Sequence, residues 1–170
     1  MNQTSIEAVD QPGRCPPELP ERGVWLGRIV PGTEASSNAV AHVSNVEYVR
    51  WLDQVGQAHL GALGWTSDQL LGSGAMWFVA RHEVDYRRET HAGETLMVAT
   101  WIRNLRRVKS WRDTIIWRQA EDEAQVVCTA STLWVHVDLD HRRPVPPPTD
   151  MAAALRDASS DAVPSWRARV

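Results

Sequence analysis

The chain has 170 residues, of which 43% are apolar and 23% are charged, and its formal net charge is −3. This balance is typical of one soluble globular domain with a sizeable core, and it argues against a general nucleic-acid binder. No apolar run reaches the roughly 18 residues of a membrane span, and residues 1–20 lack the apolar centre of a secretory signal. The two cysteines, Cys15 and Cys128, match neither a disulfide framework nor a metal site. We therefore expect a cytoplasmic protein that holds no metal or other cofactor and binds no membrane.

The composition divides the chain into three parts. Residues 1–22 contain several prolines and scattered charge, which predicts a flexible N-terminal tail. The main domain is expected over residues 23–149, and residues 150–170 are expected to be a C-terminal extension that begins with a short helix. Within the main domain, residues 24–30 predict a first strand, because Pro31 and Gly32 follow it directly.

One long helix is expected between Asn45 and Leu63. Its apolar residues recur at spacings of three, four and seven, which places them on one helical face. Gly64 is a typical helix stop. Gly56 and Gly61 lie inside the helix and each cost about 1 kcal/mol relative to alanine. We therefore expect close packing of the helix against a sheet or a second helix at these glycines.

Four strands are expected after this helix. They cover residues 76–87, 94–103, 109–118 and 125–139. In the first of them the alternation predicts one face made of Met76, Phe78, Ala80, His82, Val84 and Tyr86. Short connections favour antiparallel pairing, and the prolines near residue 146 end the sheet. The sequence therefore predicts an α+β fold in which an antiparallel sheet covers one helix.

The start of the long helix is the best candidate for a site. A polar loop that begins at Asn38 runs directly into the helix. Backbone N–H groups without intrahelical partners gather at a helix start and attract negative charge. The N–H of Ser44 or of Asn45 is therefore a candidate donor to an oxyanion. The same residues are typical N-caps, and the two roles can coexist.

The block His42-Val43-Ser44-Asn45, followed by Tyr48, Trp51 and Asp53, resembles the hotdog-fold thioesterases. The branch is that of the 4-hydroxybenzoyl-CoA thioesterase-like and acyl-ACP thioesterase-like proteins. Further similarity lies in Tyr86-Arg87-Arg88, in Ala92-Gly93-Glu94-Thr95-Leu96, and in Val135-His136-Val137-Asp138 with the following Arg142-Arg143-Pro144. The resemblance covers residues 24–148.

This resemblance implies a hotdog fold, in which an antiparallel sheet of five or six strands wraps around one long central helix. It also implies a homodimer or a dimer of dimers (a homotetramer) with the active site at the subunit interface. The implied activity is hydrolysis of acyl thioesters of CoA or of an acyl carrier protein.

The chain departs from the family in its loop. Asn38 stands where the 4-hydroxybenzoyl-CoA branch has an aspartate, and an amide is no general base or nucleophile at neutral pH. The acyl-ACP branch reads Asp-x-Asn-x-His at this place, and of these three residues only His42 is kept. Some hotdog thioesterases that serve polyketide synthases resemble this chain in carrying asparagine. There the amide would position water while backbone donors stabilise charge.

The candidate catalytic residues are Asn38, His42, Ser44, Asn45 and Asp53. His42 is the best remaining base, with the alternative that it is a loop histidine bonded to backbone. Asp53 matches the acid that recurs on the family helix, or else pairs with Arg50 at i,i+3.

The candidate substrate-binding residues are Glu47, Tyr48, Arg106, Arg107 and Lys109. The last three belong to a basic cluster with Arg103 and Arg112, which suits CoA phosphates or an acidic carrier-protein surface. A solvated hairpin rim is the alternative. Glu47 is either a base or a first-turn acid favoured by the helix dipole.

The remaining histidines are assigned packing or turn positions: His59, His82, His91, His136 and His141. Two other functions stay open. One is a non-catalytic hotdog protein that binds acyl-CoA or a partner, motivated by Asn38. The other is a hotdog dehydratase or hydratase, which the His42–Glu47 pair matches poorly.

Overall fold

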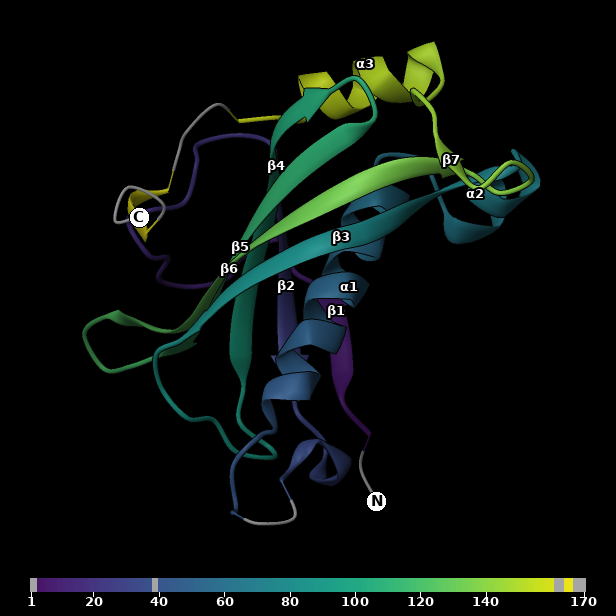
Figure 1. Ribbon diagram of the computed structural model, residues 1–170. Coiled ribbons are helices and arrows are strands. Elements are labelled where there is room, and N and C mark those ends of the chain that lie inside the picture. Colours follow the sequence, from purple (N-terminus) through teal and green to yellow (C-terminus); the bar gives the residue numbers. More distant parts are fainter. Residues whose placement is uncertain (1–2, 38–39, 161–163, 167–170) are drawn as a thin grey trace.

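The computed structural model describes residues 3–37, 40–160 and 164–166. Figure 1 shows one long helix, α1 (Asn45–Ala62), lying against a curled sheet. In the described chain six strands follow the order β1-β2-β4-β5-β6-β3 and all pair antiparallel. They are β1 (Ser5–Ala8), β2 (Val24–Val30), β3 (Ala75–Tyr86), β4 (Leu96–Arg106), β5 (Lys109–Gln119) and β6 (Ala124–Asp138). The two-residue β7 (Arg143–Pro144) pairs with β6. The predicted α+β architecture is confirmed.

Three shorter helical segments complete the described fold. The predicted C-terminal helix is present as α3 (Thr149–Asp157), and a 3-10 turn, η1 (Thr33–Ala35), precedes the site loop. Helix α2 (Ser67–Gly72) was not expected, because Gly72 and Gly74 favour a loop. Its local signal is a capping box, in which Thr66 Oγ1 accepts from the Gln69 N–H and Gln69 Oε1 accepts from the Thr66 N–H. No helix in the described residues has the length and apolar character that crossing a membrane requires.

The sheet does not pair the strands in the order in which they follow along the chain. β3 pairs with β6, and β4 lies between β2 and β5. The segment after Tyr86 therefore carries the chain from one edge of the sheet to an interior position. Sequence pattern alone predicts the strands, whereas this order depends on contacts between distant segments.

The N-terminal segment is part of the sheet rather than the expected loose tail. Ser5–Ala8 form β1 and pair with β2 along its outer edge. Further along, the Trp117 indole N–H donates to the Arg14 carbonyl oxygen at 2.9 Å. Leu19 packs against the outer-face cluster that contains Trp101 and Trp117. Four residues without a strong strand pattern form a strand here because β2 offers them an open edge.

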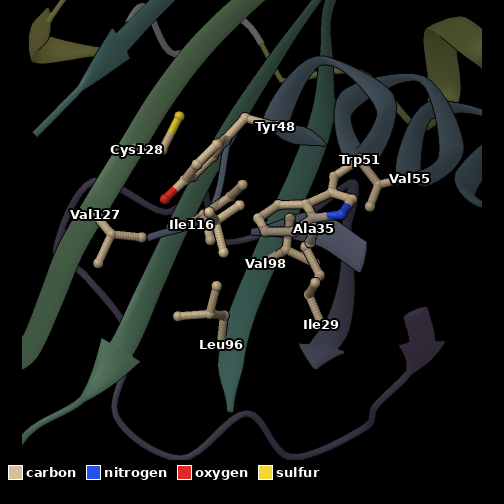
Figure 2. Close-up of a cluster of buried hydrophobic side chains, with 11 residues drawn as sticks. Ile29, Ala35, Tyr48, Trp51, Val55, Leu96, Val98, Ile116, Val127 and Cys128 are labelled. Carbon is tan, nitrogen blue, oxygen red and sulfur yellow. The ribbon is translucent and has the colours of Figure 1, made fainter. Parts of the chain in front are cut away.

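The core lies between α1 and the concave face of the sheet. Figure 2 shows Tyr48 and Trp51 of α1 directed at strand residues that include Val98 and Ile116. Trp51 is 1% exposed, so it is one of the largest fully buried side chains. Burying such an indole is worth a few kcal/mol, which fixes the first half of α1 against the sheet. The helix start is consequently a rigid element.

The C-terminal half of α1 packs on a second cluster, which includes Leu60, Trp77, Ile102 and Trp134. A Cβ at Gly56 would lie 3.0 Å from the Trp134 ring, so the expected close packing is present there. Nothing lies within 4 Å of a Cβ at Gly61 among the described residues, and the same expectation is wrong for that position. Gly64 has a φ of +91° and ends the helix as predicted.

Strand β3 forms one edge of the sheet, and its alternation is broken. Its register against β6 shifts between Val79 and Arg81. Trp77 and Val79 pack into the second cluster on one side of the shift, and Val84 packs into the first cluster on the other. Phe78 remains 44% exposed. The expected continuous face from Met76 to Tyr86 is therefore wrong.

Candidate functional site

The loop before α1 is fastened to the segment that follows β3. The Val43 N–H donates to the Thr90 carbonyl oxygen at 2.8 Å. His91 Nδ1 lies 2.5 Å from the Ala41 carbonyl oxygen, to which it donates. These bonds hold the start of the helix against residues 87–91. Residues from two distant parts of the sequence therefore share one site.

The first turn of α1 has one backbone donor for which the described residues provide no acceptor. Ser44 is the N-cap, and its Oγ accepts from the Val46 N–H at 3.4 Å. The Ser44 N–H itself donates to the Ala35 carbonyl oxygen at 2.8 Å, so it is occupied. Within the described residues no hydrogen bond takes the Asn45 N–H. Of the two donors that the sequence offers, the geometry therefore favours Asn45.

His42 lies in the loop directly before this turn. Its Nδ1 is 3.0 Å from the Val43 carbonyl oxygen. A carbonyl oxygen only accepts, so the proton of a neutral His42 ring resides on Nδ1 and Nε2 carries the lone pair. The backbone contact that the sequence offered as an alternative is present. It also sets the tautomer that a general base requires.

A hollow of about 270 Å³ opens beside the helix start. It is lined by His42, Val43, Asn45, Tyr48, Tyr86, Arg87, Arg88 and Glu89. The Tyr86 hydroxyl donates to the Asn45 carbonyl oxygen at 3.2 Å, which ties β3 to the first turn of α1. The exposed side chains of Arg87 and Arg88 bring two positive charges to the rim. We refer to this hollow as the helix-start pocket.

Tyr48 forms the buried wall of the helix-start pocket. Its hydroxyl shares a 2.7 Å hydrogen bond with Thr90 Oγ1, and its ring meets that of Tyr86 edge-on at 5.3 Å. Burial raises the pKa of the Tyr48 hydroxyl to about 12, although the hydrogen bond to Thr90 acts in the opposite direction. Tyr48 is therefore neutral at pH 7 and supplies an apolar surface with one fixed hydrogen bond.

Two predicted site residues lie elsewhere on α1. Asp53 is two helical turns beyond Asn45, about 12 Å along the axis, and accepts a 2.7 Å hydrogen bond from Gln57 Nε2. The suggested Asp53–Arg50 pair is absent from the described contacts, because Arg50 pairs with Glu47 at 2.8 Å. Glu47 does not line the helix-start pocket. The ion pair supports its assignment as a first-turn acid rather than a base.

The predicted basic residues are at the other end of the sheet. Arg106, Arg107 and Lys109 belong to the hairpin between β4 and β5, which Figure 1 shows beside α3 and away from the start of α1. The guanidinium of Arg103 stacks over the Trp111 ring at 5.3 Å in the same region. One chain therefore does not bring this cluster and the helix start together. Asn38, the remaining predicted residue, lies outside the described residues.

The other histidines have packing partners. His82 Nδ1 lies 3.0 Å from Thr132 Oγ1, and His136 Nδ1 donates to the Val145 carbonyl oxygen at 3.0 Å. His141 Nδ1 lies 3.1 Å from Asp138 Oδ1. Burial lowers the pKa of both His82 and His136. His59 differs from the rest, because its Nδ1 accepts from the buried guanidinium of Arg112 at 2.7 Å.

A family model of the thioesterase-like superfamily matches residues 34–155 of this sequence. The chain belongs to this superfamily. The matched range begins before the loop of His42 and ends within α3, so it contains the whole helix-start pocket. None of the curated proteins matches the sequence.

Solved structures confirm the hotdog fold of this thioesterase-like protein. A 1,4-dihydroxy-2-naphthoyl-CoA thioesterase from Synechocystis superimposes with a TM-score of 0.70 at 19% identity, covering 79% of this chain and 96% of that one. A Staphylococcus aureus protein in complex with CoA superimposes with a TM-score of 0.74 at 12% identity, and the match covers 84% of this chain and 87% of that one. A gentisyl-coenzyme A thioesterase superimposes with a TM-score of 0.66 at 17% identity, and the match covers 78% of this chain and 98% of that one. At these identities the likeness concerns the fold.

Five residues that line the helix-start pocket were not predicted as site residues: Val43, Tyr86, Arg87, Arg88 and Glu89. Tyr86, Arg87 and Arg88 follow directly from the end of β3 and line the helix-start pocket. The same three residues carry part of the family resemblance, which was the available signal. Their role was not visible because only the fold brings the end of β3 to the start of α1.

Proposed function

We propose that this protein hydrolyses acyl-CoA thioesters in the helix-start pocket. The observation that carries the proposal is the unused Asn45 N–H at the start of α1, next to a histidine whose tautomer suits a base. A backbone N–H at a helix start stabilises the negative charge that develops on a thioester carbonyl oxygen. Membership of the thioesterase-like superfamily supports the same reaction class.

The reaction follows from these groups. The thioester carbonyl oxygen accepts the Asn45 N–H, which polarises the carbonyl carbon. His42 Nε2 takes a proton from a water molecule as the water oxygen bonds to that carbon. The tetrahedral intermediate then collapses to the carboxylic acid as the carbon–sulfur bond breaks. The thiolate leaves and takes up the proton that His42 Nε2 holds. Asn38, at the position of the family aspartate, would orient the water through its amide.

Arg87 and Arg88 are the proposed contacts for the phosphates of CoA. Both are exposed on the rim of the pocket, and guanidinium groups suit phosphate oxygens. The two similar thioesterases described above act on CoA esters by name, and a third similar protein was solved with CoA. These likenesses support CoA over a carrier protein as the thiol component.

A second copy of the chain is proposed to pair along the β3 edge. β3 runs antiparallel to α1, since Trp77 packs with Leu60 at the helix end and Tyr86 reaches Asn45 at the helix start. An antiparallel β3–β3 pairing would bring the partner's opposite end toward each helix-start pocket. The partner's Arg106, Arg107 and Lys109 then become available to a substrate bound there.

The activity is tested by thiol release from a panel of short-chain, long-chain and aromatic acyl-CoA substrates. We expect turnover on at least one of them, and a loss of about 100-fold or more in kcat for His42→Gln with little change in KM. His141→Gln is the matched control, because His141 lies in an exposed turn. Turnover that is equal in wild type and His42→Gln would contradict the assignment of the base.

The second candidate function is acyl-CoA binding without hydrolysis. The asparagine at position 38 favours it, because an amide can act neither as a general base nor as a nucleophile at neutral pH. Calorimetry with a non-hydrolysable acyl-CoA thioether separates the two candidates. Tight binding of the thioether together with no thiol release from any CoA or carrier-protein thioester would favour the binding protein.

A further inference from the structure

A second cavity lies beneath the C-terminal half of α1. Its volume is about 40 Å³. One water molecule needs roughly 10–15 Å³, so the space holds about three waters, which is comparable to a very short carboxylic acid. Leu60, Leu70 and Leu155 form apolar parts of its wall, and Gln57 and Ser67 lie on its more exposed side.

The cavity contains a buried cation. Arg112 is 6% exposed and lines the cavity from β5. Its Nη1 donates to His59 Nδ1 at 2.7 Å and to Thr100 Oγ1 at 3.4 Å. Burial and the neighbouring Arg112 charge lower the pKa of His59 to about 3, so His59 is neutral at pH 7. Both acceptors of Arg112 are therefore uncharged.

No carboxylate in the described structure balances Arg112 on this side of the sheet. Among the residues that line the cavity, none is Asp or Glu. Asp113 follows Arg112 in β5, so its side chain points to the opposite face. There it pairs with Arg103 at 3.2 Å and accepts from Ser131 at 2.5 Å. The charge of Asp113 still favours the charged form of Arg112 from the opposite face, but among the described residues that line the cavity no carboxylate lies beside the Arg112 guanidinium.

Two tryptophans also line the cavity with their rings. The indole nitrogens of Trp77 and Trp134 are buried and have no hydrogen-bond partner within the described residues. Both residues line the cavity. A buried charge without a counter-charge lowers the stability of the folded protein, and buried donors without acceptors lower it further. A wall with a cation, apolar indole rings and no carboxylate among its described residues is complementary to an anion with a small apolar body.

We propose that this cavity binds a short-chain carboxylic acid as its anion, with the carboxylate on Arg112 and the alkyl group against the indoles. This site is separate from the helix-start pocket, because Gly56 in its wall is about 16 Å along α1 from Asn45. A short acyl group held at Asn45 cannot reach Arg112 in the same chain. A free acid fits this separation, and the far carboxylate of a long dicarboxylic acyl group is the other source of the same chemistry.

The test uses sodium propionate, with propionamide as the uncharged analogue, at constant ionic strength. The indole N–H signals of the protein are followed by NMR, each assigned by substitution of the tryptophan. We expect propionate to shift the Trp77 and Trp134 signals with a dissociation constant of about 1–10 mM, as expected for so small a ligand. Trp101 and Trp117, which pack on the outer face, should not shift.

Two variants of cavity residues and one control variant locate the binding. Arg112→Gln should weaken propionate at least tenfold, while Arg156→Gln, which removes an exposed charge from α3, should leave it unchanged. Ser110→Val fills part of the cavity and keeps Arg112, so it should also weaken binding if Arg112→Gln does not fold. Propionamide shifts equal to those of propionate, or propionate binding of wild-type affinity in folded Arg112→Gln or in Ser110→Val, would overturn the proposal.

A second measurement distinguishes the two sources of carboxylate, and it depends on the proposed hydrolysis. KM is compared for dodecanedioyl-CoA and lauroyl-CoA. An advantage of dodecanedioyl-CoA that disappears in Arg112→Gln would assign the site to the end of a substrate and support a carboxylate site even if propionate does not bind. No propionate binding together with no Arg112-dependent advantage would overturn the carboxylate site, whether or not the protein is a thioesterase.

Discussion

The Ser44 N–H donates to the Ala35 carbonyl oxygen at 2.8 Å, which leaves Asn45 as the first residue of α1 with an available backbone donor. Under the proposed function the η1 turn has a part in the chemistry, because the Ala35 carbonyl occupies the Ser44 N–H and leaves the Asn45 N–H for the substrate. The Ser44 side chain caps the helix at the same time. In the proposed mechanism, capping and oxyanion binding are thus divided between these two adjacent residues.

Removal of the cap should cost stability without removing the site. Ser44→Ala deletes the Oγ that accepts from the Val46 N–H across a long 3.4 Å. We expect the free energy of unfolding to fall by about 0.5–1 kcal/mol, the lower part of the range for N-caps. Ser44→Asp should restore it. Chemical denaturation measures both, and an unchanged midpoint in Ser44→Ala would show that this side chain does not cap the helix.

The two interior glycines of α1 should respond in opposite ways. Gly61→Ala places a methyl group in open space and should stabilise the protein by about 0.5–1 kcal/mol. Gly56→Val places its side chain against the Trp134 ring and the Arg112 side chain, so it should destabilise by about 1–3 kcal/mol. Thermal and denaturant unfolding give both values. Equal effects at the two positions would contradict the packing at Gly56.

His59 should make stability depend on pH. Burial and Arg112 lower its pKa from 6.5 to about 3, so between these values the unfolded chain binds a proton that the folded chain does not. The His59 contribution is complete above pH 6.5 and is lost as the pH falls toward 3, with a slope of up to about 1.4 kcal/mol per pH unit.

The matched measurement compares wild type with His59→Gln, which keeps an acceptor for Arg112. The free energy of unfolding is measured from pH 7 to about pH 4.5. Over this range its slope against pH should be smaller in the variant, by an amount equivalent to at most one bound proton. His82 and His136 shift in the same direction and are present in both proteins, so their contributions cancel. Identical slopes would mean that His59 is not buried as described.

The proposed β3 pairing gives an oligomer prediction. Phe78 is 44% exposed on this edge strand, so Phe78→Asp should introduce a charge into a subunit contact. We expect the variant to become monomeric in analytical ultracentrifugation and to lose thioester hydrolysis. Leu71→Asp, a comparably exposed position on α2, is the control. A dimer that persists in Phe78→Asp would place the subunit contact elsewhere.

Local patterns predicted most elements of this fold. The period of the apolar residues located α1 to within one residue at its C-terminal end, and Gly64 ended it as expected. The pattern could not predict β1 or the order of the strands, because these depend on pairing between distant segments. Nor could it show that a shift at Val79 would leave Phe78 exposed.

The site was predicted in part for the same reason. His42, Ser44 and Asn45 are consecutive or nearly so, and their placement at the helix start follows from the sequence. Arg87 and Arg88 are brought near them by the hydrogen bonds between the loop and residues 90–91 and by the Tyr86–Asn45 hydrogen bond. Arg112 was assigned to a basic hairpin cluster, yet it is buried, because its position in β5 turns it toward α1.

The central claim is that the Asn45 N–H stabilises the oxyanion, and proline at this position tests it most directly. Asn45 is the first residue of α1, where proline is tolerated, and Ser44 has the extended backbone that a following proline requires. Asn45→Pro removes the N–H, whereas Asn45→Ala removes only the side chain. We predict that kcat for acyl-CoA hydrolysis falls about 100- to 1000-fold in Asn45→Pro and stays near wild type in Asn45→Ala. Equal kcat values in these two variants, with both folded, would contradict the account.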